Sequence, residues 1–178
     1  MGMSESGGTA ERPSKTARSA LPWLWLSAFV VLADQLTKAS VVLNMPLYER
    51  IELLPVFGLT HLHNTGAAFS FLASAGGWQR WFFVAIAAAV TGLVCVWLSR
   101  LPRRGQGWLA AALALIVGGA VGNVIDRLFR GHVVDFLSFH WHQWYFPAFN
   151  VADAAITVGA VILLADSFFG DSGKKTII

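Results

Sequence analysis

The chain has 178 residues, of which 56% are hydrophobic and 13% charged, and its mean hydropathy is +0.58. This composition excludes an ordinary soluble domain and predicts an integral membrane protein. The net charge of +3 comes from basic residues between apolar stretches, so it gives no reason to expect a nucleic-acid partner.

Four apolar stretches are long enough to cross a hydrocarbon core of about 30 Å, which takes roughly 20 helical residues. None alternates like a barrel strand, and lipid does not tolerate unpaired backbone groups, so all four are predicted to be helices. The predicted fold class is all-α integral membrane, a four-transmembrane-helix bundle. The stretches are Leu21 to Leu43, Trp81 to Ser99, Trp108 to Ile125 and Phe149 to Phe169.

The basic residues predict the orientation, because cytoplasmic loops retain Lys and Arg. Eight of the 13 lie before the first stretch, between the second and third, or after the fourth. Both termini are therefore expected in the cytoplasm. We expect a disordered tail over 1–18, one membrane domain over 19–170 and a second tail over 171–178. The first stretch is expected to be a retained anchor, since no small-residue cleavage pattern ends it.

Two longer connections, 44–80 and 127–148, lie on the opposite side of the predicted bundle. In the first connection, β-branched and aromatic residues interrupted by Pro55, Gly58 and Gly66 predict short strands separated by turns. The fold is therefore expected to include a small extracytoplasmic β-containing platform. Cys95 is the single cysteine, so no disulfide can form within the chain.

Two aspartates lie where a membrane makes an acid costly: Asp126 after the third stretch and Asp153 near the start of the fourth. Because the two stretches are consecutive, both carboxylates are expected at the same depth. Neighbouring carboxylates tend to share one proton, which equips one as base and the other as acid toward water. Asn150 is expected to cap the fourth helix, which favours an ionised Asp153, whereas the carboxyl end of a helix favours a protonated Asp126.

Four sequence blocks in this order resemble the signature blocks of the lipoprotein signal peptidase family, also called signal peptidase II. They are Asp34-Gln35-Leu36-Thr37-Lys38, Asn64-Thr65-Gly66-Ala67-Ala68-Phe69, Gly122-Asn123-Val124-Ile125-Asp126-Arg127 and Phe149-Asn150-Val151-Ala152-Asp153. The resemblance covers roughly Leu21 to Phe169. One departure is Ala154, where members of the family often carry serine.

The resemblance implies an aspartic endopeptidase of the bacterial inner membrane. Such an enzyme cleaves the signal peptide from a prolipoprotein just before a cysteine that carries diacylglyceryl, at a site facing the periplasm. It implies no metal or organic cofactor, and we expect a monomer surrounded by membrane lipid. The family's catalytic pair is expected to fall on Asp126 and Asp153. The supporting polar residues are expected at Asp34, Lys38, Asn64, Asn123, Arg127, Asp135 and Asn150.

The chemistry of several of these residues also indicates possible roles without the resemblance. Asp34 and Lys38 are four residues apart and favour a helical ion pair, which either braces the fold or contacts substrate. Asn64 and Gly66 either hold the substrate backbone or form an ordinary turn. Asp135 is expected in a loop that folds back to orient Arg127 or Asn123.

Three other kinds of chemistry are weaker. The five histidines all lie outside the spans, but no His-Glu-x-x-His stretch supports a zinc site. Ser70 lacks the Gly-x-Ser-x-Gly elbow of a serine hydrolase. A small proton-coupled carrier could use the same acids as a proton relay, but carriers usually place such acids near the membrane midplane and show repeated halves.

Overall fold

Four long apolar helices form the body of the protein in the computed structural model, which describes residues 19–66, 76–102 and 105–169. A 3-10 turn, η1 (Leu21–Trp23), leads into α1 (Leu24–Asn44). The other helices are α2 (Trp78–Arg100), α3 (Gly107–Phe129) and α4 (Val151–Phe169). All four are long and apolar enough to cross a membrane, which confirms the predicted helical spans. The predicted tails, the segment from Ala67 to Phe69 and Ser70 lie outside the described residues.

The end of α3 corrects one predicted boundary. The helix was expected to end at Ile125, but it continues to Phe129 and carries Asp126 and Arg127 within its last turns. The charged side chains do not end the helix because they find partners inside the protein. The extension brings Arg130, the residue after α3, one turn beyond Asp126.

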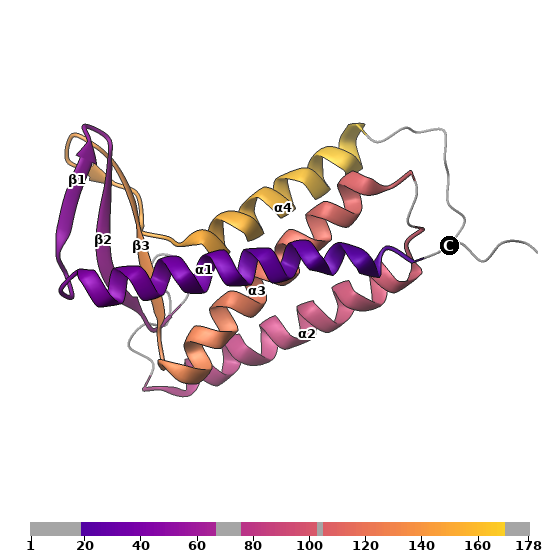
Figure 1. Ribbon diagram of the computed structural model, residues 1–178, viewed down its shortest axis with the longest axis horizontal. Helices are drawn as coiled ribbons and strands as arrows, with labels where there is room; N and C mark the ends of the chain where they lie inside the picture. The colour runs from indigo at the N-terminus through magenta and orange to yellow at the C-terminus, as the bar shows by residue number, and fades with distance from the viewer. Residues whose placement is uncertain (1–18, 67–75, 103–104, 170–178) are drawn as a thin grey trace, which may run out of the picture.

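Helix α3 is the centre of the bundle and packs against α1, α2 and α4. Small residues permit this close approach: a Cβ placed on Gly118 would lie 2.8 Å from the Val30 Cβ of α1, and one on Gly119 would collide with the Ala152 carbonyl of α4. Glycines at these two positions therefore allow the helices to pack closely. Figure 1 shows the start of α1 and the end of α4 together at one end of the bundle, away from the sheet.

The sheet is antiparallel, with its strands in the order β1-β2-β3-β4. Its strands are β1 (Arg50–Leu54), β2 (Phe57–Asn64), β3 (Val133–Trp141) and β4 (Trp144–Tyr145). The first two confirm the predicted strands. The other two were not predicted, and Asp135 lies on β3 rather than in a loop. Whether the sheet lies outside the cytoplasm stays a prediction.

The first half of β3 is held against the bundle by an apolar cluster. Val134 and Phe136 of β3 pack with Val41 and Met45 at the end of α1. This contact explains why four consecutive residues, 133–136, are buried, whereas a sheet with one wet face would alternate. Asp135 is thereby carried to the place where α1, α3 and α4 meet.

Candidate active site

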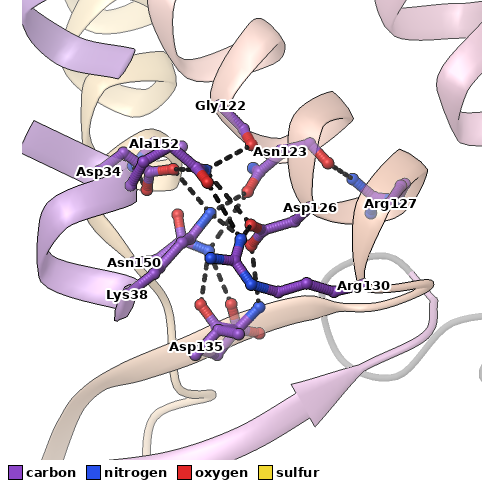
Figure 2. A network of polar contacts seen from close by, with 12 residues as sticks. Asp34, Lys38, Gly122, Asn123, Asp126, Arg127, Arg130, Asp135, Asn150 and Ala152 are labelled. Carbon is purple, nitrogen blue, oxygen red and sulfur yellow. Dashed lines mark hydrogen bonds and ion pairs between the residues drawn. The ribbon is translucent and has the colours of Figure 1, made fainter. Parts of the chain in front are cut away.

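Lys38 is completely buried and is surrounded by acceptors. Its ammonium lies 2.8 Å from Asp34 Oδ2 and 2.9 Å from Asp126 Oδ2, and it donates to Asn123 Oδ1 at 3.0 Å. A buried ammonium has three protons to satisfy, and these three contacts satisfy them. The predicted ion pair between Asp34 and Lys38 is present. It belongs to a larger network that joins α1 to α3 (Figure 2).

Asp126 is the second anion of this network and has no exposed surface. It is paired with Lys38 and with Arg130, and its Oδ2 accepts the Val134 backbone N–H at 3.1 Å. Gln35 adds a bond from Nε2 to Asp126 Oδ1 at 3.2 Å. We call Asp34, Lys38, Asp126 and Arg130 the ion-pair cluster. Its two anions and two cations balance, as buried charges generally require.

The structure places Asp126 away from the cavity that Asp153 lines, although the two acids were expected to form one water-activating pair. Asp126 is closed off from solvent by its partners and does not line the cavity described below. Lys38 and Arg130 both lie beside the Asp126 carboxylate, and the paired position of these two cations was not expected from the helix terminus alone. The order of proton loss itself stays a prediction.

Asp153 lies in the first turn of α4 and is capped reciprocally with Asn150. The Asp153 backbone N–H donates to Asn150 Oδ1 at 2.9 Å, and the Asn150 backbone N–H donates to Asp153 Oδ2 at 3.3 Å. This is the geometry of a capping box, and it confirms the predicted cap. The N-terminus of a helix favours negative charge, so the cap fixes an acid where its charge is stabilised.

Asp135 is the carboxylate that the fold brings toward Asp153. It is 4% exposed and accepts hydrogen bonds from Asn150 Nδ2 at 2.8 Å and from Asn64 Nδ2 at 3.0 Å. Burial, followed by the charge of Asp153, raises the pKa of Asp135 to about 7. A carboxyl group with this pKa exchanges its proton near neutral pH, which suits general acid and base chemistry.

Two buried asparagines connect the acids to the ion-pair cluster. Asn150 bonds Asp153 through its backbone and Asp135 through its side chain. Asn123 donates to Asp153 Oδ1 at 2.7 Å while its own oxygen accepts from Lys38. The predicted supporting roles of both asparagines thus have a physical form, because each fixes the position of a carboxylate.

Asp135 and Asp153 line one cavity of about 1000 Å³. Asn64, Asn123 and Arg127 line the same cavity, so part of its polar lining comes from residues expected from the sequence. The wall is largely apolar, with residues from α4 and from the segment after β4. Its apolar members include Phe146, Pro147, Phe149, Ile156 and Val158.

Arg127 and Gly66 meet at the edge of this site. Arg127 Nη2 donates to the Gly66 carbonyl at 3.0 Å, and the Gly66 N–H donates to Asn64 Oδ1 at 3.0 Å. Asn64 therefore forms the turn that was one of its two alternatives, and it also contacts Asp135. A contact of Asn64 with the substrate backbone stays a prediction. Asp135 does not orient Arg127 or Asn123 as expected. Its described hydrogen bonds go to Asn64 and Asn150.

Two other expectations concern Ala154 and the histidines. Ala154 uses its backbone N–H to bond the Asn150 carbonyl at 3.1 Å, so the first turn of α4 closes without a serine side chain. Within 19–66, 76–102 and 105–169, no group of three or more His, Cys, Asp or Glu side chains is arranged to hold a metal ion.

Sequence reasoning missed Arg130 and Gln35 as members of the network. Gln35 Nε2 donates to Asp34 and to the Gly122 carbonyl, and Arg130 donates to Gln35 Oε1 at 3.0 Å. Arg130 follows Asp126 by four residues, which is the spacing of a helical ion pair. That signal was hidden by ending the predicted helix at Ile125.

The fold and the site together define a small multi-span membrane protein with a carboxylate-lined cavity at one end of its bundle. The sequence model of signal peptidase (SPase) II matches residues 26–169. The chain belongs to the signal peptidase II family, a family of membrane proteases. This assignment favours the peptidase over the carrier considered above.

Relatives and solved structures agree with this family. The lipoprotein signal peptidase of Pseudomonas aeruginosa strain UCBPP-PA14 is 55% identical over 150 residues, which are 83% of this chain and 88% of that protein. The lipoprotein signal peptidase of Shewanella pealeana is 51% identical over 166 residues, 92% of this chain and 96% of that protein. A bacterial membrane enzyme structure solved by the in meso method is similar with a TM-score of 0.71 and 28% identity, covering 86% of this chain and 93% of that one.

Proposed function

We propose that the protein is an aspartic endopeptidase that removes signal peptides from prolipoproteins, with Asp135 and Asp153 as its catalytic pair. One observation carries the choice of pair. Asn150 donates to both carboxylates, through its side chain to Asp135 and through its backbone to Asp153, and both acids line the same cavity. Asp126, by contrast, is sealed in the ion-pair cluster.

The substrate follows from the family and from the character of the cavity. The relatives are named lipoprotein signal peptidases, and the cavity combines a polar floor with an apolar wall along α4. A peptide with a diacylglyceryl cysteine has the same two characters, because its backbone is polar and its acyl chains belong in lipid. The scissile bond is proposed to lie over the two aspartates, just before the lipidated cysteine.

The chemistry needs one proton on the pair. In the proposed first step, ionised Asp153 takes a proton from water while protonated Asp135 donates its proton to the carbonyl oxygen, giving a tetrahedral diol. In the second step Asp153 donates its newly acquired proton to the leaving nitrogen. Asp135 takes back a hydroxyl proton as the C–N bond breaks. Water is consumed, a carboxylic acid and an amine are formed, and the pair returns to its starting state.

The remaining residues are assigned supporting roles. The ion-pair cluster is proposed to be structural and to hold α1, α3 and β3 in the arrangement that presents Asp135. Asn123, Asn150 and Asn64 orient the two acids. Arg127 and Gly66, at the cavity edge, are proposed to contact the substrate backbone.

The family and the four apolar helices point to a bacterial inner-membrane protein. We propose that both termini are cytoplasmic, that the sheet and cavity face the periplasm, and that one copy is sufficient for activity. We further propose that residues 19–170 form a single membrane domain and that 1–18 and 171–178 are tails.

Three isosteric variants test the assignment: Asp135→Asn, Asp153→Asn and Asp126→Asn, assayed on a diacylglyceryl-modified peptide in mixed micelles. The first two are expected to lower kcat by at least about 100-fold, the scale of a lost acid or base. Asp126→Asn is expected to destabilise the fold, because removing one partner of a buried ion pair costs about 3 to 5 kcal/mol. Turnover per folded molecule should stay within about tenfold of the wild type.

The folded fraction of each variant is measured by size-exclusion chromatography in detergent, so that loss of enzyme is separated from loss of rate. Substrate binding to Asp135→Asn should persist. A folded Asp135→Asn enzyme with near-normal kcat would remove Asp135 from the catalytic pair. An inactive but fully folded Asp126→Asn enzyme would return Asp126 to it.

A further inference from the structure

Three histidines gather beside the cavity, and the mechanism above does not use them. His61 and His63 lie on β2 with ring centroids 5.1 Å apart, and the ring of His132, just before β3, stacks on His63 at 3.6 Å with an interplanar angle of 23°. His63 lines the cavity. The stack therefore connects two strands at the mouth of the site.

The stack is next to the hydrogen bond that positions Asp135. His63 pairs with Val134 in the β2 and β3 register, and its neighbours in sequence are Leu62, which pairs with Asp135, and Asn64, whose side chain donates to Asp135. His132 precedes β3 directly. His63 is therefore one residue from Asn64, and His132 is three residues from Asp135.

We propose that the stacked rings of His63 and His132 are positioning residues that hold Asn64 on Asp135 while both imidazoles are neutral, and that protonation of the rings releases this contact and lowers the cleavage rate. This inference rests on the proposed catalytic role of Asp135. Two protonated rings stacked at this distance repel each other, whereas neutral rings attract through their faces.

The surroundings keep the rings neutral near pH 7. Burial and the proximity of His61 lower the pKa of His63. Burial and His63 lower the pKa of His132, and Arg130 and His61 act in the same direction, whereas Asp126 opposes them. Arg50, Arg127, Asp135 and Asp153 are the charged groups among the residues that line the cavity. Since Asp126 is already paired with Lys38 and Arg130, its charge is largely compensated.

A double variant, His63→Phe with His132→Phe, tests the proposal because it keeps two stacked rings and removes their titration. Rates are measured from pH 5 to 8 on the diacylglyceryl peptide. Each rate is expressed relative to the rate of the same enzyme at pH 7.5. At pH 5.5 the double variant should keep at least about three times more of its pH 7.5 rate than the wild type keeps, because its rings take up no proton. We call the fall in cleavage rate below pH 7.5 the acid limb. The same acid limb in the double variant and in the wild type would overturn the proposal.

The single variants separate positioning from folding. His63→Ala removes the stack and should lower kcat several-fold at pH 7.5 with little change in KM, and His63→Phe should restore it. A histidine outside the stack provides the matched control: His142, exposed in the turn after β3 with φ of 53°, changed to Asn, which tolerates this backbone. The acid limb should not move in His142→Asn. An equal shift in this control would contradict the proposal.

A measurement without turnover supports the test if a variant folds poorly. In wild-type protein labelled with 15N-histidine, the imidazoles of His63 and His132 should titrate below the ordinary histidine range. When one of these two residues is changed to Phe, the resonance of the other should shift. Independent titration of all five would overturn the proposal. Asp135→Asn distinguishes the two claims: if it is inactive and the Phe variants retain the wild-type acid limb, the histidine proposal alone fails.

Discussion

Asp135 combines deep burial with a position beside a second carboxylate, and both features penalise its charge. Its pKa of about 7 compares with an ordinary value of 3.8. Between these values the folded protein binds a proton that the unfolded chain has lost. Stability therefore decreases as pH rises through this window and is recovered on acidification. A residue that destabilises its own fold at neutral pH is expected at a functional site rather than in a packed core.

The variant Asp135→Asn should reveal this cost. Because Asn cannot ionise, the variant escapes the destabilisation and should melt at least about 2 °C above the wild type at pH 8 in detergent. At pH 4, where Asp135 is protonated, the two melting temperatures should converge. Differential scanning fluorimetry across this range measures the difference. A constant offset at every pH would show that ionisation of Asp135 is not its cause.

The sequence predicted the residues of the site better than their roles. Asp126 was predicted to be catalytic because a charged carboxylate at a helix end in a membrane is energetically costly. In the structure, ion pairs with Lys38 and Arg130 offset this cost. Local spacing identified the pair of Asp34 and Lys38, since that contact lies within one helix. Asp135 depends on the pairing of β3 with β2 across 71 residues, and no local pattern encodes that distance.

At the scale of elements, the small residues of helix α3 determine how closely α1 and α4 pack against it. The hydrophobicity of α3 predicted a span, but the helices that it packs against were not readable from the sequence. Gly118 faces α1, whereas Gly119 and Gly122 approach the start of α4 and Asp34. One helix surface therefore brings Asp34 of α1 and Ala152 of α4 within hydrogen-bond distance, 2.9 Å between Asp34 Oδ1 and the Ala152 nitrogen.

Gly119→Ala adds only one methyl group, but it should lower both stability and activity. The added methyl group would collide with the Ala152 backbone and push α4 away from α3, which displaces Asp153, one residue further on. We expect a melting temperature lower by several degrees, at about 2 to 4 °C per kcal/mol, together with a reduced kcat. The matched control is Gly92→Ala on α2, where no atom lies within 4 Å of the added carbon.

In that control the better helix propensity of alanine should leave stability unchanged or slightly higher. Thermal unfolding and cleavage rates are measured on both proteins. Equal effects of the two substitutions would show that close packing at Gly119 does not limit the separation of α3 and α4.

At the scale of the whole molecule, the two ends of the bundle differ in character. The sheet and cavity occupy one end, and the first and last described residues occupy the other (Figure 1). The bias of basic residues predicts that the second end is cytoplasmic. This arrangement would place the acids where a translocated signal peptide leaves the membrane.

Cysteine labelling checks this orientation. In a Cys95→Ser background, Gln143→Cys in the turn between β3 and β4 should react with a membrane-impermeant maleimide in intact spheroplasts. Pro102→Cys, in the connection between α2 and α3, should react only after permeabilisation. Both positions are exposed, so failure to label would reflect sidedness. Reaction at Pro102 and not at Gln143 in intact spheroplasts would reverse the predicted topology.

The bond between Asp34 and the backbone of Ala152 has a consequence for biogenesis. A ribosome delivers α1 to the membrane long before it delivers α4, and until then one oxygen of Asp34 lacks its amide donor, while Asn150 and Asp153 have not been synthesised. The proposed catalytic pair is therefore complete only after α4 has been delivered. A chain that ends before α4 would have an incomplete polar interior and would lack Asp153, one of the two proposed catalytic acids.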